Sequence, residues 1–187
     1  MAEVVLFHHA LGVSPGVLSF ADALREAGHT VHVPDSFEGA TFPDVDAGVG
    51  FARETGFDVV MERAVSAASA LPAEVVYVGM SLGVMPAQYL AQTRPGARGA
   101  VLLYSAVPLG EFGDAWPDGV PLQMHLMSDD PFEDTPIARD LAAAVPGAEL
   151  FEYPGDRHLF ADPSSADHDP AAAALVRERV LAFLEQA

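Results

Sequence analysis

Short apolar runs alternate with longer amphipathic segments along the 187 residues of the chain. The apolar runs are nearly continuous, which is typical of strands that are buried on both faces of a parallel sheet. They predict six strands, at residues 3–8, 29–33, 74–79, 98–106, 120–128 and 148–154. The amphipathic segments predict helices at residues 14–28, 82–93, 136–145 and 169–186, with further helical spacing in 47–56 and 57–72.

Capping residues support several of these helices. Ser14 is suited to an N-cap, Pro15 to the first helical position and Gly28 to the C-terminal stop. Asp169 is the N-cap candidate of the closing helix. The alternation of strands and helices predicts one doubly wound α/β domain over residues 1–187, with a mostly parallel sheet of about six strands and helices on both faces. The expected strand order, 2-1-3-4-5-6, places a switch point between the first and third strands, where ligands of such sheets bind.

Composition narrows the possible functions. The chain has 27 acidic and 9 basic residues, all of the latter arginine, and a formal charge of -18. Such a surface repels phosphate backbones and anionic lipids, so we expect neither nucleic acid nor a membrane as a partner. The absence of cysteine excludes disulfides, thiolate metal sites and a cysteine nucleophile. The N-terminus lacks the basic region of a signal peptide, and no apolar run is long enough to span a membrane, so a cytoplasmic location is expected.

The segment GMSLG at residues 79–83 fits the pattern G-x-S-x-G and lies between a predicted strand and a predicted helix. In this context the pattern indicates a nucleophile elbow, a sharp turn that exposes the Ser81 oxygen at the carboxyl end of the sheet. The following helix directs its first amides at the same space, and the Leu82 N–H is a candidate oxyanion donor. The plainer alternative is a tight turn without chemistry.

A serine nucleophile needs a base and an orienting acid, which in this fold follow in the order serine, acid, histidine. His158 is the preferred base, because it directly follows the sixth predicted strand, whereas His168 precedes the closing helix, where a solvated position is expected. Asp129 and Asp130 both follow the fifth predicted strand. Adjacent side chains at a strand end point to opposite sides, so one of the two is expected to reach His158. Asp130 is the first choice and Asp129 the second, and an acidic surface loop is the plainer alternative.

The loop after the first strand, FHHALG at residues 7–12, is expected to supply the second oxyanion donor, the Ala10 N–H. The plainer alternative for the His8–His9 pair is a strand end with one buried and one exposed ring. Adjacent histidines on a strand diverge, so we expect no metal site, and no cofactor is required. Pocket candidates are His9, Leu11, Met80 and Phe132, with Phe42, Met85 and Trp116 as further ones.

Motifs over nearly the whole chain resemble those of the dienelactone hydrolase family of the α/β-hydrolase superfamily. They are FHHALGV, VPDSFEGATF, DAGVGFARE, GMSLG, MSDDPF and YPGDRHLFAD. The resemblance implies a compact α/β-hydrolase fold, with Ser81, Asp130 and His158 as a catalytic triad and the Ala10 and Leu82 amides as an oxyanion hole. It implies a serine hydrolase that cleaves a small ester, lactone or thioester through an acyl-enzyme, as a monomer or small homo-oligomer.

Three positions depart from the family pattern. The best-known members use cysteine where this chain has Ser81, which makes the nucleophile here more dependent on His158. They also carry an acidic residue at the position of His9, and at the position of Asp162 an arginine that helps to hold a substrate carboxylate. An aspartate would repel that group, so we do not expect dienelactone itself as the substrate. A non-catalytic domain that binds a ligand or serves as a subunit, and an acyltransferase that uses the same acyl-enzyme, stay open as alternatives.

Overall fold

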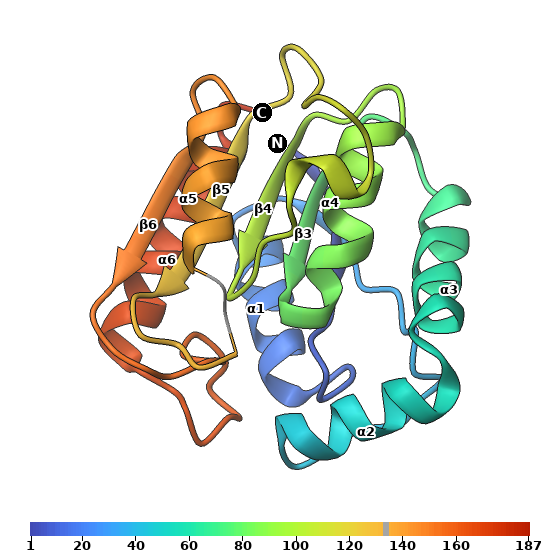
Figure 1. Ribbon diagram of the computed structural model, residues 1–187, viewed down its shortest axis with the longest axis vertical. Coiled ribbons are helices and arrows are strands. Elements are labelled where there is room, and N and C mark those ends of the chain that lie inside the picture. Colours follow the sequence, from blue (N-terminus) through green and yellow to red (C-terminus); the bar gives the residue numbers. More distant parts are fainter. Residues whose placement is uncertain (133–134) are drawn as a thin grey trace.

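The computed structural model describes residues 1–132 and 135–187. Within them, six strands form one parallel sheet in the order β2-β1-β3-β4-β5-β6, which confirms the expected switch point between β1 and β3 (Figure 1). The strands are β1 (Glu3–Phe7), β2 (Thr30–His32), β3 (Val76–Met80), β4 (Gly99–Leu103), β5 (Leu122–Met127) and β6 (Glu149–Tyr153). The α-helices are α1 (Pro15–Glu26), α2 (Val45–Thr55), α3 (Phe57–Ser69), α4 (Val84–Thr93), α5 (Thr135–Ala144) and α6 (Pro170–Leu184), with the short 3-10 helices η1 (Ser81–Gly83) and η2 (Leu109–Glu111).

The predicted α/β class is confirmed, and each expected strand and helix is present with its ends shifted by three residues or fewer. The capping residues lie where the sequence places them. Ser14 accepts from the amide of Val17 at the start of α1, and Asp169 caps α6 in the same way. Gly28 ends the first βα unit with a φ of +93°, a conformation that suits glycine.

Neighbouring residues of each strand face opposite layers of helices. In β1, Val4 and Leu6 pack in one core with α1 and α6, whereas Val5 and Phe7 pack in the other with α3, α4 and α5. Figure 1 shows α4 and α5 on the near side of the sheet. Helices therefore shield both faces of the sheet from water, which is the physical reason for the continuous apolar runs of the sequence.

The carboxyl ends of the strands lie at one edge of the sheet, the lower edge in Figure 1, and α2 lies beneath it. A small third core at this edge contains Phe37, Ala52 and Val60, against which Phe42 and Phe51 pack. Loops that leave this edge carry the candidate catalytic residues. Within the described part of the chain, no helix has both the length and the apolar character needed to cross a membrane.

Candidate active site

Ser81 lies at the turn between β3 and α4, where the backbone is strained. Its φ is +49°, in the left-handed region that a residue with a side chain rarely adopts. The two neighbouring glycines make the turn possible, because a Cβ on Gly79 would overlap the carbonyl oxygen of Gly83, and one on Gly83 would overlap that of Phe7. The elbow therefore depends on glycine at both positions, as the motif predicts.

Three side chains from three loops form one continuous hydrogen-bonded chain at this edge. Oγ of Ser81 donates to Nε2 of His158 at 2.7 Å, and Nδ1 of His158 donates to Oδ2 of Asp130 at 2.7 Å. An ionised carboxylate only accepts, so Nδ1 carries the ring proton and Nε2 presents its lone pair to the serine. His158 and Asp130 are buried, whereas Ser81 keeps partial exposure. The serine is thus the member of the chain that a ligand can reach.

The two adjacent aspartates after β5 have different surroundings. Asp130 is 5% exposed, and its second oxygen accepts from the amide of Phe132 at 2.9 Å. The exposed Asp129 accepts instead from the hydroxyl of Ser128. Asp130 is therefore the aspartate that reaches His158, whereas Asp129 faces solvent.

Two aromatic rings enclose the imidazole of His158. Phe132, 55% exposed, lies 5.1 Å from it between ring centroids, and the fully buried Tyr104 lies 5.9 Å from it. Tyr104 directly follows β4 and has a φ of +74°. Phe132 was a pocket candidate from the sequence, whereas Tyr104 was not among the candidates. Its only signal was its place just after a strand, at the edge where the other candidate residues lie.

The amides of Ala10 and Leu82 belong to the two loops that leave the switch point. Gly83 packs against the carbonyl groups of Phe7 and His8, so these two loops touch. Within residues 1–132 and 135–187, no backbone carbonyl accepts from the Ala10 amide. The Leu82 amide lies in the first helical turn after β3, where N–H groups have no acceptor within the helix. Both amides are therefore suited to donate to a ligand.

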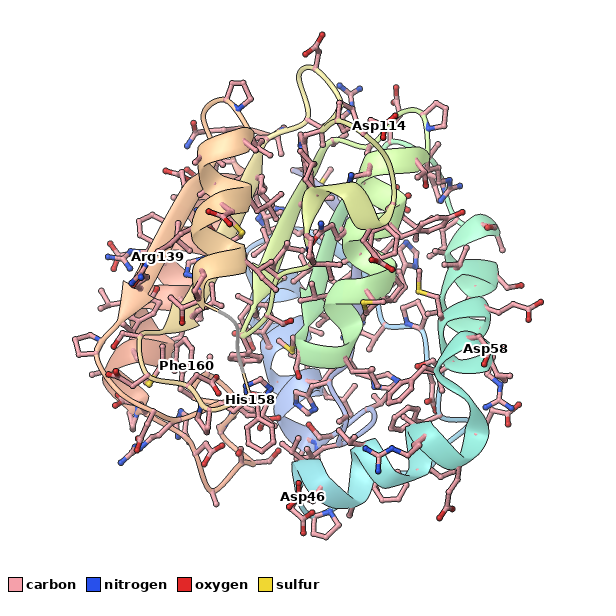
Figure 2. The ribbon with its side chains drawn as sticks, viewed as in Figure 1. Asp46, Asp58, Asp114, Arg139, His158 and Phe160 are labelled. Carbon is pink, nitrogen blue, oxygen red and sulfur yellow. The ribbon has the colours of Figure 1, made fainter. Side chains whose placement is uncertain are left out.

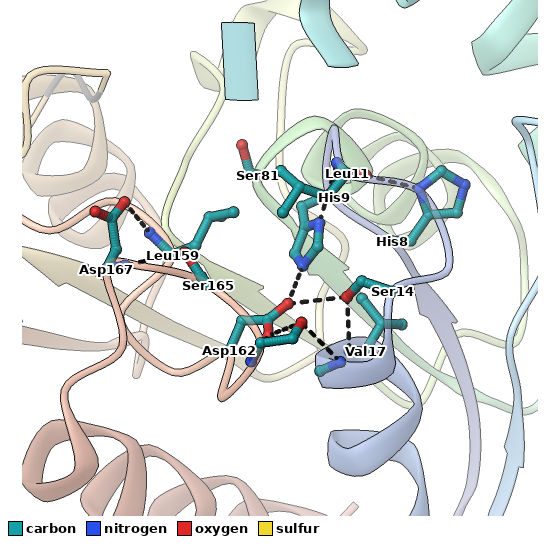
Figure 3. A network of polar contacts seen from close by, with 12 residues as sticks. His8, His9, Leu11, Ser14, Val17, Ser81, Leu159, Asp162, Ser165 and Asp167 are labelled. Carbon is teal, nitrogen blue, oxygen red and sulfur yellow. Dashed lines mark hydrogen bonds and ion pairs between the residues drawn. The ribbon is translucent and has the colours of Figure 1, made fainter. Parts of the chain in front are cut away.

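His9 holds the loop after β1 in place through two hydrogen bonds of its ring. Its Nε2 donates to Oδ2 of Asp162 at 2.6 Å, and its Nδ1 accepts from the amide of Leu11 at 3.3 Å (Figure 3). His8 and His9 are both buried, at 3% and 0% exposure, so the plainer alternative of one buried and one exposed ring is wrong. The physical reason is that each ring finds polar partners inside the protein, which offset the loss of water.

The carboxylate of Asp162 is turned into the protein, with hydrogen bonds at both oxygens. It accepts from His9 and from the Ser14 hydroxyl at 2.9 Å (Figure 3). It also accepts from the amide and the hydroxyl of Ser164, at 2.6 Å each. Burial alone would raise the pKa of Asp162, but the hydrogen bonds from His9 and Ser164 outweigh it and lower the pKa to about 2. The described residues hold no cluster of three or more His, Asp or Glu side chains that could bind a metal ion.

A cavity of about 250 Å³ lies beside the elbow, between α3 and α4. It is lined by Phe7, His8, Ser36, Phe57, Val60, Met61, Ala64, Leu82, Gly83, Met85 and Pro86. Of the pocket candidates from the sequence, Met85 lines this cavity. His8 lines it instead of its neighbour His9, since the two rings diverge.

The other pocket candidates lie elsewhere. Leu11 and Met80 are buried in the core on the α1 and α6 face, because the alternation along β3 turns Met80 away from α4. Phe42 packs in the third core. Trp116 is packed just before β5, where its indole N–H donates to the carbonyl of Val120, at the opposite edge of the sheet. None of these side chains lines the cavity, and neither do His9 and Phe132.

Comparisons with known proteins agree with this fold and motif set. No curated protein matches the chain. A dienelactone hydrolase-like promiscuous phosphotriesterase from metagenomic libraries has 16% identity and a TM-score of 0.78, over 99% of this chain and 86% of that one. A dienelactone hydrolase from Anabaena variabilis has 20% identity and a TM-score of 0.67, over 97% and 85%. A cold-adapted esterase from an Arctic intertidal metagenomic library has 16% identity and a TM-score of 0.65, over 98% and 82%.

At these identities the solved structures establish a shared fold. The family follows from a sequence model described as the dienelactone hydrolase family, which matches residues 1–187. The chain therefore belongs to the dienelactone hydrolase family, hydrolases that act on ester bonds, since a lactone is a cyclic ester.

Proposed function

We propose that this chain is a serine hydrolase that cleaves a small ester, lactone or thioester through an acyl-enzyme on Ser81. The observation that carries the proposal is the chain of hydrogen bonds from Ser81 through His158 to Asp130, with both donor–acceptor distances at 2.7 Å. A serine hydroxyl is a weak nucleophile until a positioned base can take its proton. Burial of His158 and Asp130 keeps water from competing for these hydrogen bonds.

In the first half-reaction Oγ of Ser81 attacks the carbonyl carbon while its proton passes to Nε2 of His158. The Asp130 carboxylate stabilises the imidazolium that forms and holds its orientation. The carbonyl oxygen becomes an oxyanion, which the amides of Ala10 and Leu82 stabilise. The bond from the carbonyl carbon to the leaving oxygen, or to the leaving sulfur of a thioester, then breaks, the leaving atom takes the proton from His158, and the acyl group stays on Ser81.

In the second half-reaction water replaces the alcohol. His158 takes a proton from the water as its oxygen attacks the acyl carbon, and the same two amides hold the second oxyanion. When that intermediate collapses, the bond to Oγ breaks and His158 returns its proton to Ser81. The carboxylic acid leaves, and the free enzyme is restored without a cofactor.

The experiment combines a serine-directed fluorophosphonate probe with p-nitrophenyl esters. The wild-type chain is expected to be labelled at Ser81 and to hydrolyse the esters, and Ser81→Ala to lose both labelling and about 10⁴-fold or more of kcat. His158→Gln is expected to lose both in the same way, because Ser81 then lacks its base.

Two variants provide matched controls. Ser66→Ala removes an exposed serine of α3, and His168→Gln removes a histidine that forms no part of the hydrogen-bonded chain, so both should keep wild-type rates. Absence of labelling and turnover in the folded wild-type chain would overturn the proposal. Full turnover by Ser81→Ala would overturn the assignment of the nucleophile.

A further inference from the structure

The cavity beside the elbow bears on the substrate class, an inference that rests on the proposed hydrolase function. We infer that it receives the acyl part of the ester, and that the enzyme prefers an uncharged apolar acyl group of medium length. Acetate would leave the cavity empty, and an acyl chain that ends in a carboxylate would bring an unpaired charge into it.

The cavity lies where the topology of the sheet places a ligand. Phe7 and His8, at the carboxyl end of β1, form part of its wall, and Leu82 and Gly83, just after β3, form another part. These two strands flank the switch point, at which ligands of open α/β sheets bind. Leu82 belongs both to the cavity wall and, through its amide, to the proposed oxyanion hole, so the cavity begins one residue from the nucleophile.

The positions of His158 and of the cavity indicate which part of the substrate the cavity receives. The loops of Asp130 and His158 follow β5 and β6, on one side of β3, whereas the cavity lies toward β1 and α3 on the other. In Figure 2, His158 lies below the strands, and Asp58, at the start of α3, lies across α4 from it. The leaving group must depart beside His158, which protonates it. The acyl substituent therefore points toward the cavity.

The cavity walls are apolar. One face of α3 contributes Phe57, Val60, Met61 and Ala64, which follow the spacing of three and four residues that places side chains on one face of a helix. Phe57 and Met85 are exposed large hydrophobic residues, at 47% and 36%, and form the rim on α3 and α4. Such a surface stabilises alkyl or aryl groups in proportion to the apolar area that they bury.

The two polar side chains of the wall are already paired with each other. His8 donates through Nδ1 to the carbonyl of His9 at 2.8 Å, and its Nε2 accepts from the hydroxyl of Ser36 at 2.9 Å. Burial lowers the pKa of His8, so its ring stays neutral at pH 7. A ligand therefore meets no free donor at this end of the cavity.

Charge also disfavours an anionic acyl group. The lining residues, all within the described part of the chain, include no arginine, and the Asp35 carboxylate lies 3.8 Å from Nε2 of His8. The guanidinium of Arg63, on α3, is held by Glu38 at 2.9 Å. A carboxylate in the cavity would lose its hydration without gaining a partner.

The volume sets the length of the acyl group. A dry protein cavity of about 150 Å³ accepts the six carbons of a benzene molecule, so by proportion one of about 250 Å³ has room for roughly ten carbons, enough for the eight of an octanoyl chain. Each buried methylene contributes enough binding free energy for a few-fold change in affinity. We therefore expect kcat/KM to rise more than tenfold from acetate to octanoate.

The test measures kcat/KM for p-nitrophenyl acetate, butyrate, hexanoate and octanoate. It also uses the mono-p-nitrophenyl ester of suberic acid, in which a carboxylate replaces the terminal methyl group of the octanoyl chain. Ala64→Phe fills the cavity from α3, and Ala67→Phe adds the same ring to the exposed face of the same helix. The octanoate-to-acetate ratio is expected to fall at least tenfold in Ala64→Phe and to stay at the wild-type value in Ala67→Phe. If Ala64→Phe does not fold, Met61→Trp, at the same wall, takes its place.

The outcomes separate this inference from the proposed function. A folded wild-type chain that hydrolyses none of the esters and resists the fluorophosphonate overturns the function itself. A chain that hydrolyses them with no rise toward octanoate, with equal rates for the suberate ester, or with a ratio that the cavity-filling variant leaves unchanged, overturns the assignment of the cavity and leaves the function standing.

Discussion

Nε2 of His9 lies 2.6 Å from Oδ2 of Asp162, and this buried contact joins residues 153 positions apart in the chain. His9 belongs to the loop after β1, which carries the Ala10 amide. Asp162 follows His158 by four residues, and its amide donates to the carbonyl of Leu159 at 3.0 Å. The contact therefore couples the position of the proposed oxyanion donor to that of the proposed base.

The first prediction concerns the stability that Asp162 provides. Its pKa of about 2 lies below the ordinary value of 3.8, so the ionised form stabilises the fold by about 2 kcal/mol. That contribution is complete above about pH 4 and is lost as the pH falls through 2. Asp162→Asn should therefore lower the free energy of unfolding at pH 7, and the difference from wild type should shrink at pH 3. Urea unfolding at both pH values measures it.

The exposed Glu54→Gln is the control, because its side chain is in solvent and its loss should change little at either pH. A stability difference between wild type and Asp162→Asn that stays constant from pH 7 to pH 3 would contradict the assignment of this carboxylate as a buried, hydrogen-bonded anion.

A second prediction uses two glycines of α2. A Cβ on Gly48 would overlap the carbonyl oxygen of Ala10, whereas a Cβ on Gly50 meets open space. Gly48→Ala should displace the Ala10 loop and lower kcat for ester hydrolysis tenfold or more with a smaller change in KM, because the amide acts on the transition state. Gly50→Ala should keep kcat and raise helix stability by up to about 1 kcal/mol. Equal kcat values for the two variants would refute the loop's part in catalysis.

The adjacent aspartates offer a third prediction. Asp130→Asn replaces the carboxylate that accepts from the His158 Nδ1–H with a neutral amide, whose N–H group favours the wrong ring tautomer, so kcat should fall by about 10³- to 10⁴-fold. Asp129→Asn changes an exposed carboxylate one residue away and should stay within about twofold of wild type. Steady-state kinetics on one ester, with circular dichroism to check the fold, distinguish the two. A larger loss in Asp129→Asn would reverse the assignment.

The fourth prediction concerns the hydroxyl of Tyr104, whose ring contacts that of His158. The Tyr104 hydroxyl is buried without a well-formed hydrogen bond among the described residues, and burial raises its pKa, which the nearby backbone amide of Ala161 offsets only in part. Tyr104→Phe should therefore raise the unfolding free energy by about 1 kcal/mol, or the Tm by about 2–4 °C. Tyr77→Phe is the matched opposite, since the Tyr77 hydroxyl accepts from Arg94 at 3.1 Å and its removal should lower the Tm. Calorimetry that shows a loss of stability in both variants would contradict the prediction for Tyr104.

Much of the fold could be predicted from the sequence because its signals are local. Continuous apolar runs indicated strands that are buried on both faces of the sheet. Ser14 and Asp169 indicated where α1 and α6 begin, because an N-cap residue directly precedes its helix. The elbow around Ser81 is equally local, since Gly79 and Gly83 supply the space that its turn requires. The strand order then brought the loops of Asp130 and His158 to the same edge.

Contacts between distant segments could be decided only by the tertiary structure. His9 and Asp162, two separate departures from the family pattern, are hydrogen-bonded to each other. The family has an acidic residue at the first position and a basic one at the second, whereas this chain has a histidine and then an aspartate. This reversal was the only signal of the contact in the sequence. Met80 was expected in a pocket but is buried in the core on the α1 and α6 face of the sheet. Ala64 of α3 and Met85 of α4 line one cavity, although they come from different helices. The sequence by itself thus determined the strands, the helices and the nucleophile turn, because each depends on near neighbours in the chain. The partner of each buried polar group and the shape of the cavity depend on side chains that only the packing of helices against the sheet brings together.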